Sequence, residues 1–573
     1  MYDVPMHIDA VPNRGSRPAY LLRESFREGG KVRKRTLANL SSLPDEQIFA
    51  IRAVLRGEKL HRADELFEAI ASRPHGHVHA VRVAMQRVGF ESLVASRRHR
   101  ERDLVCAMVA ARIIAPHTKL ATTRWWHTTT LAEEFEVADA DEDDLYAAMD
   151  WLLERQGAIE KKLAARHLGE GSLVLYDLSS SYFEGTTCSL AKLGHNRDGK
   201  KGKLQVNYGL LTDRRGCPVA VSVHDGNTND PKTLMPQVDK LKKDFGIQTL
   251  VLVGDRGMIS QKAITELREQ DQVGWITALK TPQIRALVEG GQLQLGLFDE
   301  KNLFEISHPD FPAERLIACR NPELAKLRSH KRQSLLEATE KELEKVRGMV
   351  EHGRLHGRDA IGVRVGKIVN KYKVAKHFAL DIEDHRFGFQ RLENNIASEA
   401  ALDGIYIIRT SLAKKQMTAA DCVRNYKSLA QVERAFRSLK TIDLRIRPIH
   451  HHLADRVRSH IFLCMLAYYV EWHMREAWRP LLFADEDQLA KTTRDPVAPA
   501  KRSAAAQAKV ATHTLDDGTP AHSFSTLQQE LATIVRNTCR TPRAGDDAPI
   551  FNITTTPNPK HRHALQLLDA IHL

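Results

Sequence analysis

The chain has 573 residues, 42% of them hydrophobic and 27% charged. This ordinary globular balance excludes a largely disordered chain, a collagen-like fibre and a disulfide-stapled miniprotein. At about 100–200 residues per domain, the length predicts three or four domains. Lysine and arginine number 85 against 72 aspartates and glutamates, so the formal net charge is +13, which favours a polyanionic partner.

Cysteine spacing and hydropathy indicate the cellular compartment of the protein. The seven cysteines are spread along the chain and no two have a Cys-x-x-Cys spacing, so the sequence encodes neither a disulfide framework nor a zinc site. The longest apolar run, from Ile461 to Val470, is too short to cross a bilayer, and the N-terminus lacks the pattern of a signal peptide. We therefore expect a soluble protein of the reducing cytoplasm with no membrane partner.

The first predicted element is a basic hairpin within residues 1–44, centred on a turn at residues 28–31. Its second strand carries Arg33, Lys34 and Arg35. These charges fit two interpretations, a solvated edge strand or contact with the DNA backbone.

Residues 45–170 are predicted to be helical. Apolar residues recur at three- and four-residue steps in segments such as 103–115 and 144–165, and a basic cluster lies at 97–100. We expect a helical DNA-binding region here, although no specific motif marks it.

Strand patterns appear between residues 171 and 280. Two short apolar runs each end in an acid, the first at Asp177 and the second at Asp255, with a hairpin and a helix between them. The full order is strand, hairpin, helix, strand, helix, strand. It predicts a mixed sheet flanked by helices, with both acids at one edge of the sheet.

Residues 281–402 interrupt this pattern and are predicted to form an α+β insertion domain. Its centre is a highly charged helix from about 322 to 351, and short strands are expected around it, including 361–369 and 377–381. The predicted division of the chain is therefore a basic hairpin (1–44), a helical region (45–170), the first part of the α/β core (171–280), the insertion domain (281–402), the second part of the core (403–480), and a linker with a C-terminal tail (481–573).

A third acid lies on a long helix predicted in the second part of the core. Tyr426, Glu433, Arg437 and Lys440 follow one another at steps of seven, four and three residues, so they form a polar stripe beside an apolar one. One helix can therefore offer a carboxylate and two cations to the same ligand.

Asp177, Asp255 and Glu433 together predict a metal site. Three converging carboxylates repel one another unless cations lie between them, and Mg²⁺ or Mn²⁺ prefers such oxygen ligands. Two Mg²⁺ ions, with Mn²⁺ able to substitute, can activate an attacking oxygen and stabilise the leaving 3′-oxygen of a phosphodiester. Each acid alone is more often a cap or a salt-bridge partner.

Three motifs surround these acids in chain order: Tyr-Asp-Leu-Ser at 176–179, Gly-Asp-Arg-Gly at 254–257, and Tyr426…Glu433…Lys440. They resemble the motifs of insertion-sequence DDE transposases with an RNase H-like catalytic core. More narrowly, they resemble the group with a tyrosine–arginine–glutamate–lysine signature, which also has an insertion before the glutamate helix. The resemblance covers most of residues 171–480.

The resemblance implies a fold, an activity and partners. The fold is an RNase H-like mixed sheet with a helical N-terminal region and an α+β insertion domain. The activity is a DNA transposase that binds terminal inverted repeats, cleaves the element ends by two-metal hydrolysis and joins the 3′-hydroxyl ends to target DNA by transesterification. The protein is expected to act as a homodimer on double-stranded DNA, associated with the bacterial nucleoid when bound.

The resemblance and the basic segments also predict residues that contact DNA: Tyr426, Arg434, Arg437, Lys440, Arg256, Arg33, Lys34 and Arg35. One departure is Leu429, which stands where the signature has arginine. Either Arg434 or Arg437 takes the place of that arginine, or no DNA hairpin forms. Two alternatives stay open, an RNase H-like metal-dependent nuclease without strand transfer and an inactive transposase-derived DNA-binding protein.

Overall fold

The computed structural model describes residues 6–58, 66–541 and 549–573. The chain forms two compact units. The smaller unit comprises Met1–Arg73 with Val535–Thr556, and the larger comprises Pro74–Ile534 with Pro557–Leu573.

The smaller unit contains a three-stranded antiparallel sheet of β1 (Met6–Asn13), β2 (Ser16–Glu28) and β3 (Lys31–Asn39), followed by α1 (Asp45–Leu55). The predicted hairpin is present as β2 and β3, with Arg27 opposite Val32. A further strand, β1, pairs with β2, so the sheet has one strand more than the predicted hairpin.

A second sheet in the smaller unit joins distant parts of the sequence. Its order is β16 (Ile550–Thr554), β15 (Val535–Arg540) and β4 (Glu68–Pro74). Because β4 lies within residues 45–170, the prediction of helix throughout that region is wrong there. The strand forms because a partner strand from near the end of the chain supplies its hydrogen bonds.

The larger unit begins with a helical layer. Its helices are α2 (Gly76–Arg87), α3 (Phe90–Val94), α4 (Arg100–Ile114), α5 (Lys119–Trp125), α6 (Leu131–Glu134), α7 (Glu142–Glu154) and α8 (Gln156–His167). The apolar helix α4 packs against α7 and against α18 (Ala454–Ala477), and most of its side chains are buried. Within the described residues, no single helix is both long and apolar enough to span a membrane. Arg100–Ile114 with Lys119–Thr128 meets that test only as a pair bent by 86°.

The central sheet of the larger unit has eight strands in the order β10-β11-β14-β9-β8-β5-β6-β7. Their bounds are β5 (Ser172–Tyr182), β6 (Gln205–Asp213), β7 (Pro218–Asp225), β8 (Leu250–Val253), β9 (Val273–Ala278), β10 (Leu303–Ile306), β11 (Arg315–Arg320) and β14 (Ile405–Thr410). β5, β6 and β7 are antiparallel, whereas β8 runs parallel to β5 and β9 parallel to β8. Numbered along the chain, these five strands follow the order 3-2-1-4-5, which is the RNase H-like core that the motifs predict.

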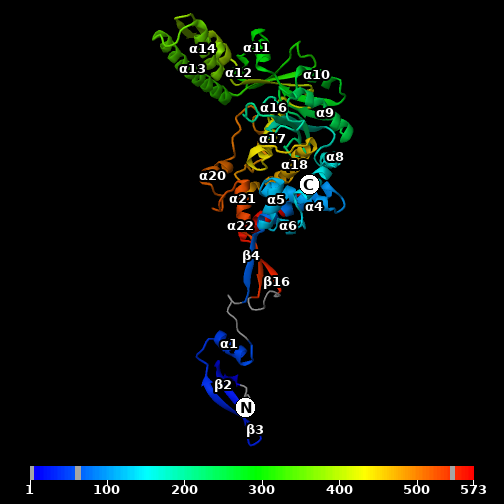
Figure 1. Ribbon diagram of the computed structural model, residues 1–573, viewed down its shortest axis with the longest axis vertical. Helices are drawn as coiled ribbons and strands as arrows, with labels where there is room; N and C mark the ends of the chain where they lie inside the picture. Colours follow the sequence, from blue (N-terminus) through cyan, green and yellow to red (C-terminus); the bar gives the residue numbers. More distant parts are fainter. Residues whose placement is uncertain (1–5, 59–65, 542–548) are drawn as a thin grey trace. The chain divides into compact units, whose positions relative to one another are not determined.

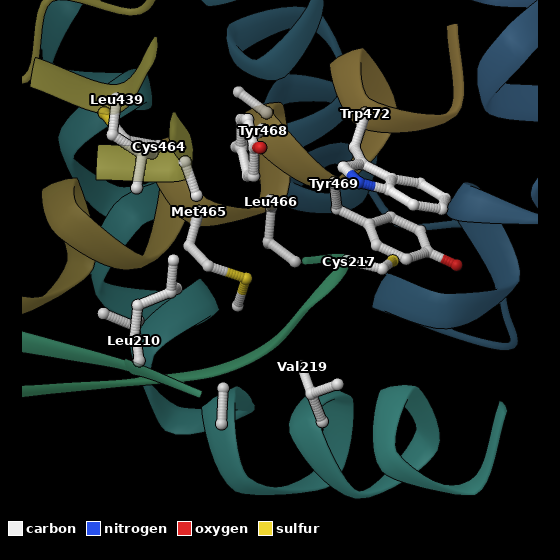
Figure 2. Close-up of a cluster of buried hydrophobic side chains, with 14 of the residues drawn as sticks. Leu210, Cys217, Val219, Leu439, Cys464, Met465, Leu466, Tyr468, Tyr469 and Trp472 are labelled. Atoms are coloured by element: carbon white, nitrogen blue, oxygen red, sulfur yellow. The ribbon is translucent and has the colours of Figure 1, made fainter. Parts of the chain in front are cut away.

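Helices cover the sheet because its strands are apolar on both faces. Between β7 and β9 the chain forms α9 (Leu234–Asp239) and α10 (Gln261–Arg268). Figure 2 shows Met465 and Leu466 of α18 pointing toward the strands that carry Leu210 and Val219, and all four side chains are buried. This packing buries α18 and makes it the central helix of the larger unit.

Residues 281–402 contain α11 (Thr281–Glu289), α12 (Leu297–Glu300), α13 (Pro322–Glu351), α14 (Arg358–Tyr372), β12 (Phe378–Ile382), β13 (Phe387–Arg391) and α15 (Glu393–Ala400). The charged helix is α13, with the predicted bounds. Residues 361–369, expected as a strand, are part of α14, which lies beside α13 (Figure 1). Ile361, Val365 and Ile368 fall on one helical face, so the same apolar residues bury better as a helix. The strands β10 and β11 also depart from the prediction, because they extend the central sheet.

Residues 481–534 and 557–573 belong to the larger unit and contain α19 (Ala490–Thr493), α20 (Ala504–Thr512), α21 (Phe524–Leu531) and α22 (Pro559–Asp569). The helix α22 packs against α2, and Trp478 Nε1 donates a 2.9 Å hydrogen bond to the carbonyl of Ala564. The predicted linker and tail are therefore folded against the helical layer over much of their length.

Candidate active site

The sheet places Asp177 and Asp255 side by side. Leu175 of β5 is paired with Val253 of β8 in parallel register, and each acid follows two residues later. The turn after β8 holds Asp255, whose Oδ1 accepts hydrogen bonds from the amides of Gly257 at 3.0 Å and Met258 at 2.7 Å. Both acids therefore lie just past the last paired residues of β5 and β8. The prediction that Asp177 ends its strand is wrong, because β5 continues to Tyr182 through its pairing with β6.

Glu433 reaches the same place from a helix. It lies on α17 (Leu429–Arg437), which packs against β5. Asp177, Asp255 and Glu433 line one cavity of about 410 Å³. The structure therefore brings together the three acids that the sequence singled out.

The helix that carries Glu433 is not continuous, contrary to the prediction. Tyr426 lies on α16 (Ala419–Lys427), and Ser428 separates it from α17. The Ser428 hydroxyl donates a 2.5 Å hydrogen bond to the carbonyl of Asn425, which satisfies an acceptor at the end of α16. Consequently Glu433, Arg437 and Lys440 line the acidic cavity, whereas Tyr426 lines a neighbouring one.

In the acidic cavity, the carboxyl group of Asp177 is buried near the carboxylate of Asp255. Desolvation raises the pKa of Asp177 to about 7. The Leu178 amide, which donates to Oδ1 at 2.8 Å, opposes this rise, and the negative charge of Asp255 adds to it. The site thus crowds carboxylates together in a way that a bound divalent cation would relieve.

The carboxylates fit a divalent metal in their chemistry. Their oxygens are the ligands that Mg²⁺ and Mn²⁺ prefer. Among the described residues, these three acids do not all bring an oxygen within 4.8 Å of one another, so they do not surround a single point.

Sequence analysis missed several residues of this cavity. Arg197 holds Asp230 through two short contacts of 2.6 and 2.7 Å, and both side chains line the cavity. The sequence did mark the position of Asp230, because this residue precedes Pro231 in the turn that opens a helix. Arg197 lies in the long loop after β5, where no periodicity marks it.

The side chain of Asp198, another missed residue, is only 2% exposed and pairs with two cations of the cavity. Lys440 Nζ lies 2.6 Å from its Oδ1, and Arg447 is paired with the same oxygen. Lys440 Nζ also donates to Ser179 Oγ at 3.1 Å. Burial lowers the pKa of Lys440, which the charge of Asp198 opposes.

The neighbouring cavity, of about 790 Å³, is strongly basic and is bordered by Tyr426 and Arg256. Other cations lining it are Arg285, Arg328, Lys331, Arg332, Lys371, Lys373 and Lys376. Burial and the nearby charge of Asp255 raise the pKa of Tyr426 to about 12, so its hydroxyl stays protonated at neutral pH. The cavity therefore offers hydrogen-bond donors and positive charge, which suit a phosphate-rich ligand.

The other predicted contact residues lie elsewhere. Arg434 is exposed on α17 but lines neither of these cavities. Arg33, Lys34 and Arg35 are exposed on β3 of the smaller unit. Each of these three is paired with an acid of its own sheet: Glu28, Asp9 and Glu24 respectively.

Two family models match the chain. The model described as Transposase DDE domain matches residues 170–470, and the one described as IS1634 family transposase, N-terminal domain, matches residues 8–69. A comparison with curated proteins gives no match. Among solved structures, the cryo-EM structure of a piggyBac transposase synaptic complex with hairpin DNA aligns over 79% of this chain and 77% of that chain. The identity is 8% and the TM-score 0.34, which is too low to define a shared fold.

Proposed function

The chain belongs to the DDE transposases of insertion sequences, and we propose that it binds the terminal inverted repeats of its element, cleaves the element ends in a metal-dependent reaction and joins the freed 3′-hydroxyls to target DNA. One observation carries this proposal. Asp177, Asp255 and Glu433 come from three separate segments and line one cavity at the edge of an RNase H-like sheet.

In this proposal the three carboxylates hold two Mg²⁺ ions, with Mn²⁺ able to substitute. Such ions polarise a phosphodiester and stabilise the oxygen that leaves it. The cations of the cavity have a separate task. Arg437 is exposed at the rim of the cavity and forms no ion pair with another described residue, so its guanidinium can hold a phosphate oxygen, while Lys440 is held inside by Asp198.

The chemistry needs no ATP and no covalent link to the protein. In cleavage, a water oxygen bonds to phosphorus and loses a proton, while the bond from phosphorus to the 3′-oxygen breaks and that oxygen takes up a proton to become a hydroxyl. In joining, this 3′-hydroxyl oxygen bonds to a phosphorus of the target and loses its proton, while the bond from that phosphorus to a target 3′-oxygen breaks and the displaced oxygen takes up a proton. One phosphodiester is exchanged for another, so the same set of acids can serve both steps.

The basic residues supply sequence-independent affinity for DNA. Tyr426 and Arg256 border the large basic cavity next to the acids, where they would contact a strand that leaves the active site. Arg33, Lys34 and Arg35 would contact the DNA backbone from the smaller unit, which contains the region matched by the transposase N-terminal domain. Since two element ends must be joined, we expect a homodimer on DNA.

The test uses the full chain with duplexes that carry the flanking element ends, Mg²⁺, and strand-specific mapping of the products. Asp255→Asn and Glu433→Gln should abolish cleavage and joining while DNA binding is retained. The matched control is Glu266→Gln, an acid on α10 outside the cavity, which should leave both steps unchanged. Cleavage without joining, even from pre-cut 3′-hydroxyl ends, would indicate a nuclease. DNA binding without either step would indicate an inactive derivative.

A further inference from the structure

Three metal-ligating side chains from distant parts of the chain meet outside the acidic cavity. His167 is the last residue of α8, Cys217 lies in the turn between β6 and β7, and His473 lies on α18. Cys217 Sγ is 3.9 Å from Nε2 of each histidine, and the three ligand atoms lie within 4.8 Å of one another. Among the described residues this is the single group of three or more histidine, cysteine or acidic side chains with such a geometry.

We propose that His167, Cys217 and His473 form a metal site that binds one Zn²⁺ ion per chain and ties α8 and α18 to the β6–β7 turn. The site is independent of the proposed DNA chemistry. Its nitrogen and sulfur ligands suit Zn²⁺, whereas the oxygen ligands of the acidic cavity suit Mg²⁺.

The two sulfur-to-nitrogen distances require little movement to bind zinc. With Zn–S at about 2.3 Å and Zn–N at about 2.0–2.1 Å, a tetrahedral site puts sulfur and nitrogen about 3.5 Å apart. The observed 3.9 Å is slightly wider. His167 Nε2 lies 3.1 Å from the Tyr469 hydroxyl and would exchange that contact for the metal.

The turn that carries Cys217 is well defined. Asp213 Oδ1 accepts hydrogen bonds from the amides of Arg215 at 2.8 Å and Cys217 at 2.9 Å, and Gly216 adopts a φ of +87°. Figure 2 shows the Cys217 side chain beside Tyr469 of α18. The thiol is thus held against the helix that provides His473 before any metal arrives.

The two histidines already have the protonation state that binds a metal, whereas Cys217 must lose a proton. Burial lowers the pKa of His167 to about 4 and that of His473 to about 3, so both imidazoles are neutral and keep a free lone pair at pH 7. Burial raises the pKa of Cys217, so its thiol carries a proton without metal. On binding, a bond forms between Zn²⁺ and sulfur, the S–H bond breaks, and the proton leaves to solvent without any redox change.

A cavity borders the two histidines, although Cys217 does not line it. This cavity of about 400 Å³ is lined by both histidines, Arg215 and Glu476, and has room for a water molecule. Arg166 and Arg215 add positive charge around the site, and Asp213 and Glu476 offset it. Three protein ligands with a solvent-filled fourth position are therefore the expected coordination.

The experiment measures metal content and Co²⁺ spectra of the full chain. Protein purified without chelator under reducing conditions should contain about one zinc per chain by elemental analysis. Replacing that zinc with Co²⁺ should produce the near-ultraviolet thiolate-to-cobalt charge-transfer band. Asp255→Asn, which disables only the acidic cavity, should keep the zinc and the band. Cys106→Ser, at another buried cysteine, should keep them as well.

Cys217→Ser should lose the charge-transfer band and the zinc, and His473→Ala should lose the zinc. No zinc and no cobalt band in the unaltered protein would overturn the proposal, and this result does not depend on whether any variant folds. A band that persists in Cys217→Ser would overturn it too. Either outcome would mean that the three side chains only form hydrogen bonds with one another.

Discussion

Replacing Asp198 with asparagine tests whether the cations of the acidic cavity depend on one buried carboxylate. Asp198 is 2% exposed and neutralises Lys440, whose side chain is 10% exposed, and Arg447, whose side chain is 22% exposed. The substitution keeps the shape of the side chain and removes its charge. Two largely buried cations are then left without their counter-ion.

The expected cost follows from these contacts. Removing one partner of a buried ion pair destabilises a protein by about 3–5 kcal/mol, because the remaining charge is desolvated and unpaired. The single asparagine oxygen can accept either from the Tyr182 amide, now 3.0 Å from Asp198 Oδ2, or from the cations, but not from both. Lys440 keeps its contact with Ser179, which reduces the cost. We therefore expect the free energy of unfolding to fall by about 3 kcal/mol, the lower end of this range.

Urea unfolding followed by tryptophan fluorescence measures this loss, and hydrogen exchange of the β5 amides localises it to the larger unit. The control is Glu184→Gln, which breaks an exposed pair with Lys203 at 2.9 Å and should cost no more than about 1 kcal/mol. Adding Lys440→Met to Asp198→Asn should recover part of the stability, since one orphaned cation is removed. A loss for Asp198→Asn no larger than that of the control would refute the reasoning.

Three further predictions concern the metal, acid stability and DNA affinity. Excess chelator should abolish strand cleavage and added Mg²⁺ or Mn²⁺ should restore it, so cleavage that survives chelation would contradict the proposed chemistry. Burial, with the charge of His75, lowers the pKa of His77 to about 4. Because the unfolded chain then binds more protons between about pH 4 and 6.5, stability should fall as pH drops through that window, by at most about 1.4 kcal/mol per pH unit. Urea midpoints at pH 5 and 7 should differ less in His77→Asn than in the unaltered protein, and equal differences would be evidence against this origin. Replacing Arg33, Lys34 and Arg35 with alanine should reduce the salt dependence of DNA binding by up to about 0.9 in log–log slope per lost phosphate contact, whereas an unchanged slope would assign them to a solvated strand.

Local patterns predicted much of the fold and the acids of the candidate site. The apolar runs before Asp177 and Asp255 form the parallel-paired parts of β5 and β8, although β5 continues past Asp177 to Tyr182, and α13 has the predicted bounds. A strand that is buried on both faces must be apolar along its length, so the sequence shows it directly. Residues 361–369 were wrongly predicted as a strand, because a short apolar segment fits a helix or a strand equally well until its neighbour, α13, is known.

By itself, the sequence determined the order of the core strands along the chain, the place of Asp255 just after β8, and the family motifs around the acids. The tertiary structure alone decided the contacts between distant segments, including the pairing of Lys440 with Asp198, the break at Ser428 and the meeting of His167, Cys217 and His473. The physical reason is the distance along the sequence over which each interaction acts. Periodicity and capping act within a few residues, whereas an ion pair or a ligand set depends on side chains that only the folded chain brings together.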